Sequence, residues 1–417
     1  MINFSRFRLD NGLTVLVHED HTTAMAAVNI LYKVGARDES PEQTGFAHLF
    51  EHLMFGGSVN IPNYDAPLQS VGGENNAFTS NDITNYYITL PSNNLETAFW
   101  LESDRMLSLA FSDQSLEVQR QVVCEEFKQR YLNQPYGDVW LKLRPLAYKV
   151  HPYRWATIGK ELKHIEDAKM EDVKAFFHKY YTPQNAIMVV AGDVNLEEVK
   201  VLADKWFGSI PAGNSFVRDI PQEPKQAEAR KEWVEADVPV DALYIAFHGP
   251  DRLSADYYAT DLITDLLSRG ASSRLYRALV KENQLFSEIN AYMMGSIDTN
   301  LIVVEGKPLP HISLEEAEKY IWKELENIKT HAVEEVELQK VKNKIQSTML
   351  FAELSILDKA MNLAFFEMLN KAEDYNHETS KYEAVTSSDI TRLANQIFTE
   401  ENSNTLYYQS KQKENVE

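Results

Sequence analysis

The chain contains the sequence GFAHLFEHLMFGG at residues 45–57. Within it, His48 and His52 stand four residues apart, with Glu51 next to the second histidine. In a helix these side chains project from one face, one turn apart. That spacing suits two ligands of a tetrahedral zinc ion, with the carboxylate placed to take a proton from a zinc-bound water. The Gly56-Gly57 pair that follows is typical of a helix C-terminus.

The residues around the two histidines are apolar on almost every side, which predicts a buried helix. Buried histidines and a buried glutamate need polar partners, and a metal ion supplies them. The alternative, two solvated histidines on a polar helix face, fits this apolar setting poorly. The order H-x-x-E-H is also the reverse of the commoner zinc-protease order H-E-x-x-H. The stretch therefore predicts a buried zinc-binding helix.

A third ligand has to come from another part of the chain, and residues 119–130 offer one. This segment lacks glycine and proline and carries a stripe at three-four spacing whose middle is apolar, which predicts a helix with an inward face. Glu126 lies within the stripe, whereas Glu125 points about 100° away from it. We therefore expect Glu126 to bind the metal and Glu125 to be solvated or to contact a ligand. Without zinc, a salt bridge from Glu126 to Arg130 is the alternative.

With these residues in place, the chain resembles the insulinase/pitrilysin metallopeptidases (peptidase family M16, inverzincins). Within them it is similar to the short-chain branch that includes mitochondrial processing peptidase. The resemblance covers nearly the whole chain and includes two further runs, GGENNAFT at 72–79 and YYTPQNA at 180–186, the latter followed by Gly192-Asp193. It implies a zinc endopeptidase that acts on peptides or small unfolded segments.

The resemblance also implies roles for single residues. It implies that Zn²⁺ is held by His48, His52 and Glu126. Glu51 would be the general base, taking a proton from water and later returning it to the leaving amine.

The resemblance further places an exposed strand edge beside the substrate, formed by Asn76, Ala77, Phe78 and Thr79. An extended peptide can join such an edge as one more strand. Many members carry a glutamate seven residues before the metal-binding one, where this chain has Gln119. An amide still accepts a hydrogen bond from a ligand imidazole but brings no negative charge, so it should polarise that ligand less.

Composition bounds the class of protein. The 417 residues suffice for two ordinary domains, and 44% hydrophobic with 25% charged residues is typical of soluble globular proteins. No apolar run reaches the length of a membrane span. The net charge of −21 argues against nucleic acid as a partner. It would attract basic peptides if the acidic residues lined a binding chamber, although a merely solvated acidic surface is the simpler interpretation.

The N-terminus has no charged start followed by an apolar stretch. We therefore expect a cytoplasmic protein, or a periplasmic one if a signal peptide has been removed. The single cysteine, Cys124, forbids an internal disulfide and is interpreted as a small core residue.

Strands are predicted at 4–9, 13–18, 24–34, 77–90 and 186–191. Helices are predicted at 95–108, 114–132, 137–150, 170–179 and 196–207, in addition to the zinc helix. Residues 208–229 are rich in proline and polar residues and are typical of a linker. The polar stretch 410–417 is expected to fray.

The second half of the chain repeats the first. Residues 262–270 align with 49–57 at an offset of 213 (262 − 49). Asp261 and Asp265 then stand where the two histidines are, so the repeat lacks the metal ligands. We expect an α+β fold with two homologous α/β domains, each a mostly antiparallel sheet packed by helices. The predicted parts are a catalytic domain at 1–210, a linker at 211–229 and a non-catalytic domain at 230–417, with one Zn²⁺ per chain.

The resemblance also implies a partner. Longer family members enclose substrate between two halves, and the short members pair instead. We therefore expect a homodimer, or a heterodimer with a related chain, around a chamber. The alternative is a catalytically weak or inactive structural subunit of a heterodimeric peptidase, although the intact motif favours an enzyme. A zinc amidohydrolase or phosphoesterase would call for aspartate-rich or His-x-His clusters, which we do not find in the sequence.

Overall fold

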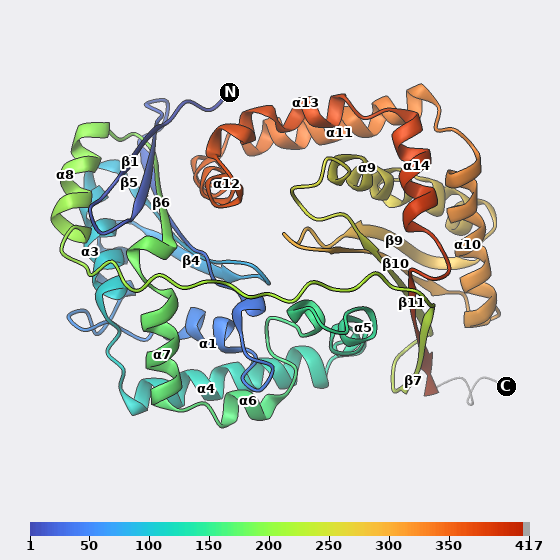
Figure 1. The fold of residues 1–417 in the computed structure, drawn as a ribbon, viewed down its shortest axis with the longest axis horizontal. Coiled ribbons are helices and arrows are strands. Elements are labelled where there is room, and N and C mark those ends of the chain that lie inside the picture. Colours follow the sequence, from blue (N-terminus) through green and yellow to red (C-terminus); the bar gives the residue numbers. More distant parts are fainter. Residues whose placement is uncertain (412–417) are drawn as a thin grey trace. The chain divides into compact units, whose positions relative to one another are not determined.

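The computed structural model describes residues 1–411, which form two compact units (Figure 1). The first unit consists of 1–129, 155–220 and 349–377, and the second takes the remaining segments. Each unit thus contains a segment from the other half of the chain. These packing units differ in extent from the domains that the internal repeat suggests, because they exchange 130–154 and 349–377.

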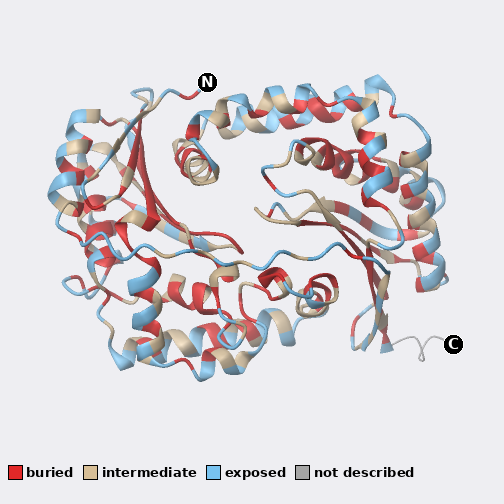
Figure 2. Cartoon of the chain, viewed as in Figure 1, coloured by how far each residue is buried: buried red, intermediate tan, exposed pale blue. Residues whose placement is uncertain are grey.

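The first unit is built on a six-stranded sheet with the order β1-β2-β6-β3-β5-β4. The strands are β1 (Ser5–Arg8), β2 (Thr14–Glu19), β3 (Met25–Tyr32), β4 (Glu74–Thr79), β5 (Thr84–Pro91) and β6 (Ala186–Gly192). The β2–β6 pair is parallel and the other pairs are antiparallel. The central strands β3 and β6 are buried almost throughout because helices cover both faces of the sheet (Figure 2).

One face of this sheet is covered by α12 (Ile356–Leu369), which comes from the C-terminal half of the chain. Its Ala360, Leu363 and Ala364 pack with Leu31 and Val189 in a shared hydrophobic core. Several helices of the first half belong to the same unit and pack around the sheet or against one another, among them α1 (Phe46–Leu53), α3 (Leu95–Leu107), α7 (Met170–Tyr180) and α8 (Leu196–Phe207).

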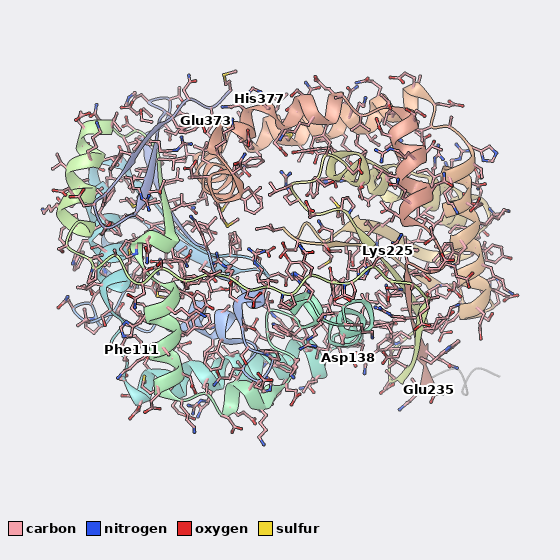
Figure 3. All side chains as sticks on the ribbon, in the orientation of Figure 1. Phe111, Asp138, Lys225, Glu235, Glu373 and His377 are labelled. Carbon is pink, nitrogen blue, oxygen red and sulfur yellow. The ribbon has the colours of Figure 1, made fainter. Side chains whose placement is uncertain are left out.

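Ion pairs hold α12 and the residues after it against the strands of the first unit. Lys359 of α12 donates to Asp20 at 2.7 Å, and both side chains are largely buried. The Lys359 ammonium, together with the Thr22 hydroxyl, holds the pKa of the Asp20 carboxyl below its usual range. Arg6 of β1 pairs with Glu367 at 2.6 Å and with Glu373, labelled in Figure 3, at 2.7 Å.

The second unit repeats this topology. Its sheet has the order β7-β11-β8-β10-β9. The strands are β7 (Arg230–Ala236), β8 (Ala242–Gly249), β9 (Phe286–Met293), β10 (Asn300–Pro308) and β11 (Ser403–Ser410). The β7–β11 pair is parallel, as β2–β6 is in the first sheet, and the other pairs are antiparallel. The order therefore matches β2-β6-β3-β5-β4 strand for strand, and the predicted fold class is confirmed.

Helices also cover the second sheet. One face carries α5 (Val139–Ala147), which comes from the N-terminal half and starts after Asp138, labelled in Figure 3. On the other face, Phe247 of β8 contacts Trp322 of α10 (Leu314–Thr330). The same unit contains α9 (Tyr257–Ser268), α14 (Ser387–Ile397) and most of α11 (Glu335–Ala352). The division between the units falls near the end of α11, after Thr348. Among residues 1–411, no helix combines the length and the apolar character that a membrane span requires.

Two expectations need correction or restriction. The strand predicted at 77–90 is a hairpin, because the chain turns between β4 and β5. The Ser80 hydroxyl accepts the N–H groups of Asp82 and Ile83 in that turn, and Asn81-Asp82 are typical turn residues. The expected fraying at 410–417 falls largely on residues outside the described range, and Ser410 itself belongs to β11.

The Asp20–Lys359 pair predicts a pH-dependent contribution to stability. Because folding lowers the pKa of Asp20, the stabilisation is complete above the pKa of the unfolded chain, about 4, and is lost as the pH falls through the folded value. Asp20→Asn should lower the free energy of unfolding by about 1–3 kcal/mol at pH 7. In urea denaturation the gap between variant and parent should shrink below pH 4. Asp10→Asn, which removes an exposed carboxylate, should leave the urea midpoint near that of the parent.

Candidate metal centre

The helix α1 begins where a buried carboxylate meets its first N–H groups. Glu39 accepts hydrogen bonds from the backbone of Gly45 at 2.9 Å and of Ala47 at 2.8 Å, which satisfies donors that lack partners within the helix. Burial raises the pKa of Glu39 to about 8. Gly45 has a φ of 87°, and a Cβ there would lie 2.6 Å from the Ile158 carbonyl oxygen, so the turn into α1 requires glycine.

One face of α1 packs into the core of the first unit. Its Phe46, Leu49, Phe50 and Leu53 are buried. The Phe50 ring stacks on Phe176 at a centroid distance of 4.8 Å and on Tyr181 at 5.2 Å. This packing sets the rotation of the helix about its axis. The other face, with His48, Glu51 and His52, stays only partly buried.

An ion pair on α3 supports the loop after α1, and sequence reasoning missed it. Glu102 and Arg105 are fully buried and pair with each other, and the Glu102 carboxylate also accepts the Tyr64 hydroxyl at 2.7 Å. The Arg105 guanidinium lies 4.5 Å from the centroids of the Tyr64 and Tyr86 rings. An acid and a base three residues apart in a helix that is otherwise mostly buried is the signal that could have indicated this pair.

The helix α4 (Asp113–Phe127) brings Glu126 to the two histidines. The Nε2 atoms of His48 and His52 lie 3.7 and 3.4 Å from Oε2 of Glu126. One ligand atom of each residue lies within 4.8 Å of those of the other two. Tetrahedral ligands at zinc bond lengths of about 2.0–2.2 Å stand roughly 3.3–3.6 Å apart, so the donor set fits the ion. Within residues 1–411, no other group of three such side chains comes together.

The neighbours of Glu126 on α4 lie differently. Glu125 is exposed and pairs with Lys128 at 2.7 Å, away from the histidines. Gln119 lies two turns before Glu126 and is partly exposed. Its predicted contact with a ligand imidazole stays a prediction.

The strand β4 reaches the site through Thr79. The Thr79 hydroxyl donates to Oε2 of Glu51 at 2.7 Å. Burial raises the pKa of Glu51, and the Thr79 hydrogen bond opposes that rise. Because side chains alternate along a strand, Ala77 lies on the same face as Thr79, whereas Asn76 and Phe78 lie on the opposite face and are exposed. The four residues predicted at the substrate are therefore split between the two faces of an edge strand.

The second unit carries no comparable cluster in its described part. On α9, Asp261 and Asp265 stand at the positions that correspond to the histidines of α1. Asp261 accepts the Tyr382 hydroxyl at 2.8 Å, and Asp265 pairs with Arg269 at 3.2 Å. Burial raises the pKa of both carboxyls. Protein groups thus bind the carboxylates that replaced the imidazoles.

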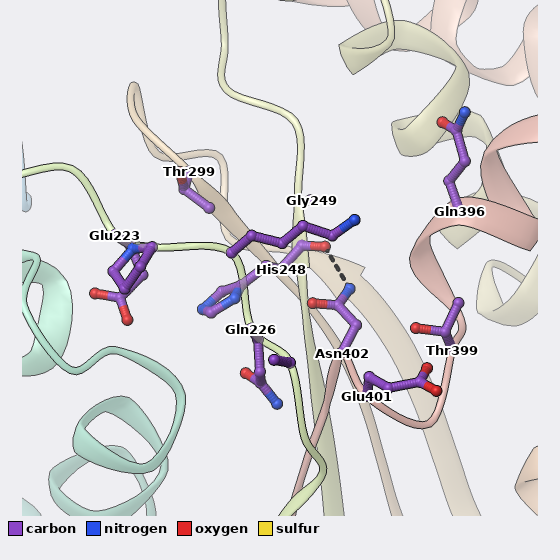
Figure 4. A pocket seen from close by; sticks show the side chains of 12 residues that line it. Glu223, Gln226, His248, Gly249, Thr299, Gln396, Thr399, Glu401 and Asn402 are labelled. Atoms are coloured by element: carbon purple, nitrogen blue, oxygen red, sulfur yellow. Dashed lines mark hydrogen bonds between the residues drawn. The ribbon is translucent and has the colours of Figure 1, made fainter.

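A cavity of about 690 Å³ lies in the second unit (Figure 4). The segment before β7, the end of β8 and the residues around the end of α14 contribute Gln226, His248 and Asn402. The Asn402 amide donates to the carbonyl of His248 at 2.9 Å, which ties two walls together. The cavity is lined by none of the residues of the metal cluster, so its size does not make it the reactive site.

Comparison with known proteins agrees with this geometry. Residues 14–148 match the family model of the insulinase family, peptidase family M16, and residues 167–345 match that of the peptidase M16 inactive domain. The chain is 32% identical over 407 residues to the zinc protease PqqE of Helicobacter pylori, covering 96% of this chain and 91% of that protein. It is 27% identical over 364 residues to the mitochondrial-processing peptidase subunit beta of Saccharomyces cerevisiae, covering 83% and 78%.

A solved structure agrees as well. The crystal structure of a protease from Helicobacter pylori superimposes with a TM-score of 0.92 at 31% identity, covering 98% of this chain and 100% of that one. Both the sequence and the fold therefore place the chain among proteins with the same architecture over their full length. The chain belongs to the insulinase family, peptidase family M16.

Proposed function

We propose that the chain is a zinc-dependent endopeptidase that hydrolyses peptides or small unfolded polypeptides, with one Zn²⁺ per chain. The observation that carries this proposal is the convergence of His48, His52 and Glu126 beside Glu51. Relatives named zinc proteases support the choice of metal and of reaction. The match of 167–345 to a domain described as inactive is consistent with a single site in the first unit.

The chemistry is divided between the ion and the protein. Bound zinc supplies Lewis-acid charge, which acidifies water and stabilises a developing oxyanion. Glu51 is the general base. Its Oε2 is occupied by the Thr79 hydroxyl, so Oε1 takes the proton from the attacking water and later passes it to the nitrogen of the leaving amine. Burial keeps the carboxylate in a medium where its charge is poorly solvated, which favours its acceptance of a proton.

The edge strand β4 is the proposed place for the substrate backbone. It is the last strand in the order of the first sheet, so one of its edges faces no other strand. The Ala77 N–H donates to the side-chain oxygen of Asn76 at 2.8 Å, outside the strand ladder. A peptide carbonyl can take the place of that oxygen, and the substrate then adds as one more strand. Main-chain recognition of this kind tolerates many sequences.

The proposal includes a paired chain. A relative named as a subunit, of mitochondrial-processing peptidase, supports a dimer with an identical or related chain. The chamber between two such chains and the cytoplasmic location stay predictions. The intact donor set and the base beside it favour an enzyme over an inactive structural subunit.

The general-base role predicts the behaviour of Glu51→Gln. An amide cannot accept the proton of water, so kcat on a quenched fluorescent basic peptide should fall by about 10²- to 10⁴-fold. The zinc content, measured by elemental analysis, should stay at the parent value because Glu51 is not among the three ligands. A parent-like kcat at equal metal loading would exclude Glu51 as the base.

The metal assignment predicts a contrast between neighbouring glutamates. Glu126→Ala should lower the zinc content well below one ion per chain, because a ligand with negative charge is lost. Glu125→Ala is the matched control and should keep the parent zinc content, since Glu125 is exposed and pairs with Lys128. A chelator should abolish parent activity, and zinc should restore it. The ligand set is wrong if Glu126→Ala keeps zinc at the parent stoichiometry or Glu125→Ala loses it.

The edge-strand proposal predicts the effect of Ala77→Pro. Proline removes the N–H of this residue, and it is tolerated on an edge strand where that N–H faces away from the sheet. The KM for an extended peptide should rise by roughly tenfold, the equivalent of one hydrogen bond. Ala77→Gly keeps the N–H and is the control. An unchanged KM in Ala77→Pro would show that the substrate does not pair with this edge.

A further inference from the structure

We propose that Thr79 is a positioning residue that holds the base Glu51 by its carboxylate rather than a residue that binds substrate. This inference rests on the proposed function and assigns a role within the same site. The Thr79 hydroxyl donates to Oε2 of Glu51 at 2.7 Å. The base on α1 thus accepts a hydrogen bond from a side chain of the strand β4.

The position of the Thr79 hydroxyl is set by rigid structure. Thr79 is the last residue of β4 and lies opposite Thr84, the first residue of β5. The Thr84 hydroxyl donates to the carbonyl of Val34 at 2.9 Å, and Thr84 is fully buried. Threonine is also β-branched, which restricts rotation about its first side-chain bond. The hairpin thus fixes the hydroxyl in space before any substrate arrives.

The partner side chain needs this restraint. Glutamate has three rotatable side-chain bonds, and α1 fixes only its Cα and Cβ atoms. The hydrogen bond to Oε2 selects one orientation of the carboxylate and leaves Oε1 for the proton of water. Catalytic groups have to be held within about half an ångström of their productive place, and supporting hydrogen bonds supply that precision. Loss of the Thr79 hydroxyl should therefore slow proton transfer without weakening the binding of metal or peptide.

The hydrogen bond from Thr79 to Glu51 also links substrate binding to chemistry. Thr79 lies on the same edge strand as Ala77, whose N–H is the proposed contact for the peptide backbone. A peptide that joins this edge would lie along the strand that holds the base. A donor already engaged by Glu51 is not free to bind the peptide, which separates Thr79 from Ala77 in function.

Thr79→Val tests this role because it removes the hydroxyl and keeps the β-branched shape. The expected result is a fall in kcat of about 10- to 100-fold, the usual effect of losing a supporting hydrogen bond, with KM and zinc content unchanged. Thr79→Ser keeps a hydroxyl and should restore most of the rate. Thr89→Val is the matched control, because Thr89 lies on the same hairpin, opposite Glu74. It should leave kcat at the parent value.

Peptide binding without turnover gives an independent readout. In the Glu51→Gln background, adding Thr79→Val should leave the Kd of the basic peptide unchanged, measured by fluorescence anisotropy. A weaker Kd would show that Thr79 contacts substrate and would overturn the proposal. A fully active Thr79→Val in an active parent would also overturn it and leave the proposed function intact. A parent that shows no chelator-sensitive cleavage would instead overturn the proposed function, and the role of Thr79 with it.

Discussion

The site depends on how α1 is seated against the core of the first unit. The helix buries Phe46, Leu49, Phe50 and Leu53, and the Phe50 ring stacks on Phe176 and Tyr181. Each of these large side chains stabilises the folded state by about 1.5–3 kcal/mol when it is fully buried. Rotation of α1 about its axis would expose these side chains to water. Their burial therefore fixes the orientation of the helix. The polar residues between them then have to face α4 and β4, where a ligand and a clamp for the base are found.

The same topology in the second unit shows that the fold does not bring the chemistry with it. The order of five strands and the place of the parallel pair are the same in both sheets. At the positions of the two imidazoles, however, α9 carries Asp261 and Asp265, which bind Tyr382 and Arg269. A few side chains on an unchanged scaffold thus decide whether a unit offers a metal site, as expected where function resides in residues grafted on a fold.

Because segments are exchanged, the core of each unit depends on a helix from the other half of the chain. The helix α12 completes the core of the first unit from the C-terminal half, and α5 completes that of the second from the N-terminal half. Neither core is complete until the chain has passed through both units. The largely buried Asp20–Lys359 pair lies at such a junction, between a strand end and α12. Its charges are close in space although the residues are far apart in sequence, so loop closure has to occur before they attract.

The sequence by itself determined the features that depend on local spacing. The helix that carries His48, Glu51 and His52, the central strands and the repeat all follow from apolar periodicity and turn residues, which act over a few positions. Periodicity also set Glu126 rather than Glu125 on the inward stripe of α4. Tertiary structure alone decided which distant residues meet. The hydrogen bond from Thr79 to Glu51 and the exchange of α5 and α12 join segments whose contacts leave no periodic trace in the sequence. These long-range contacts depend on how the sheets and helices pack. Packing is determined by many interactions across the whole fold and not by any one stretch of chain.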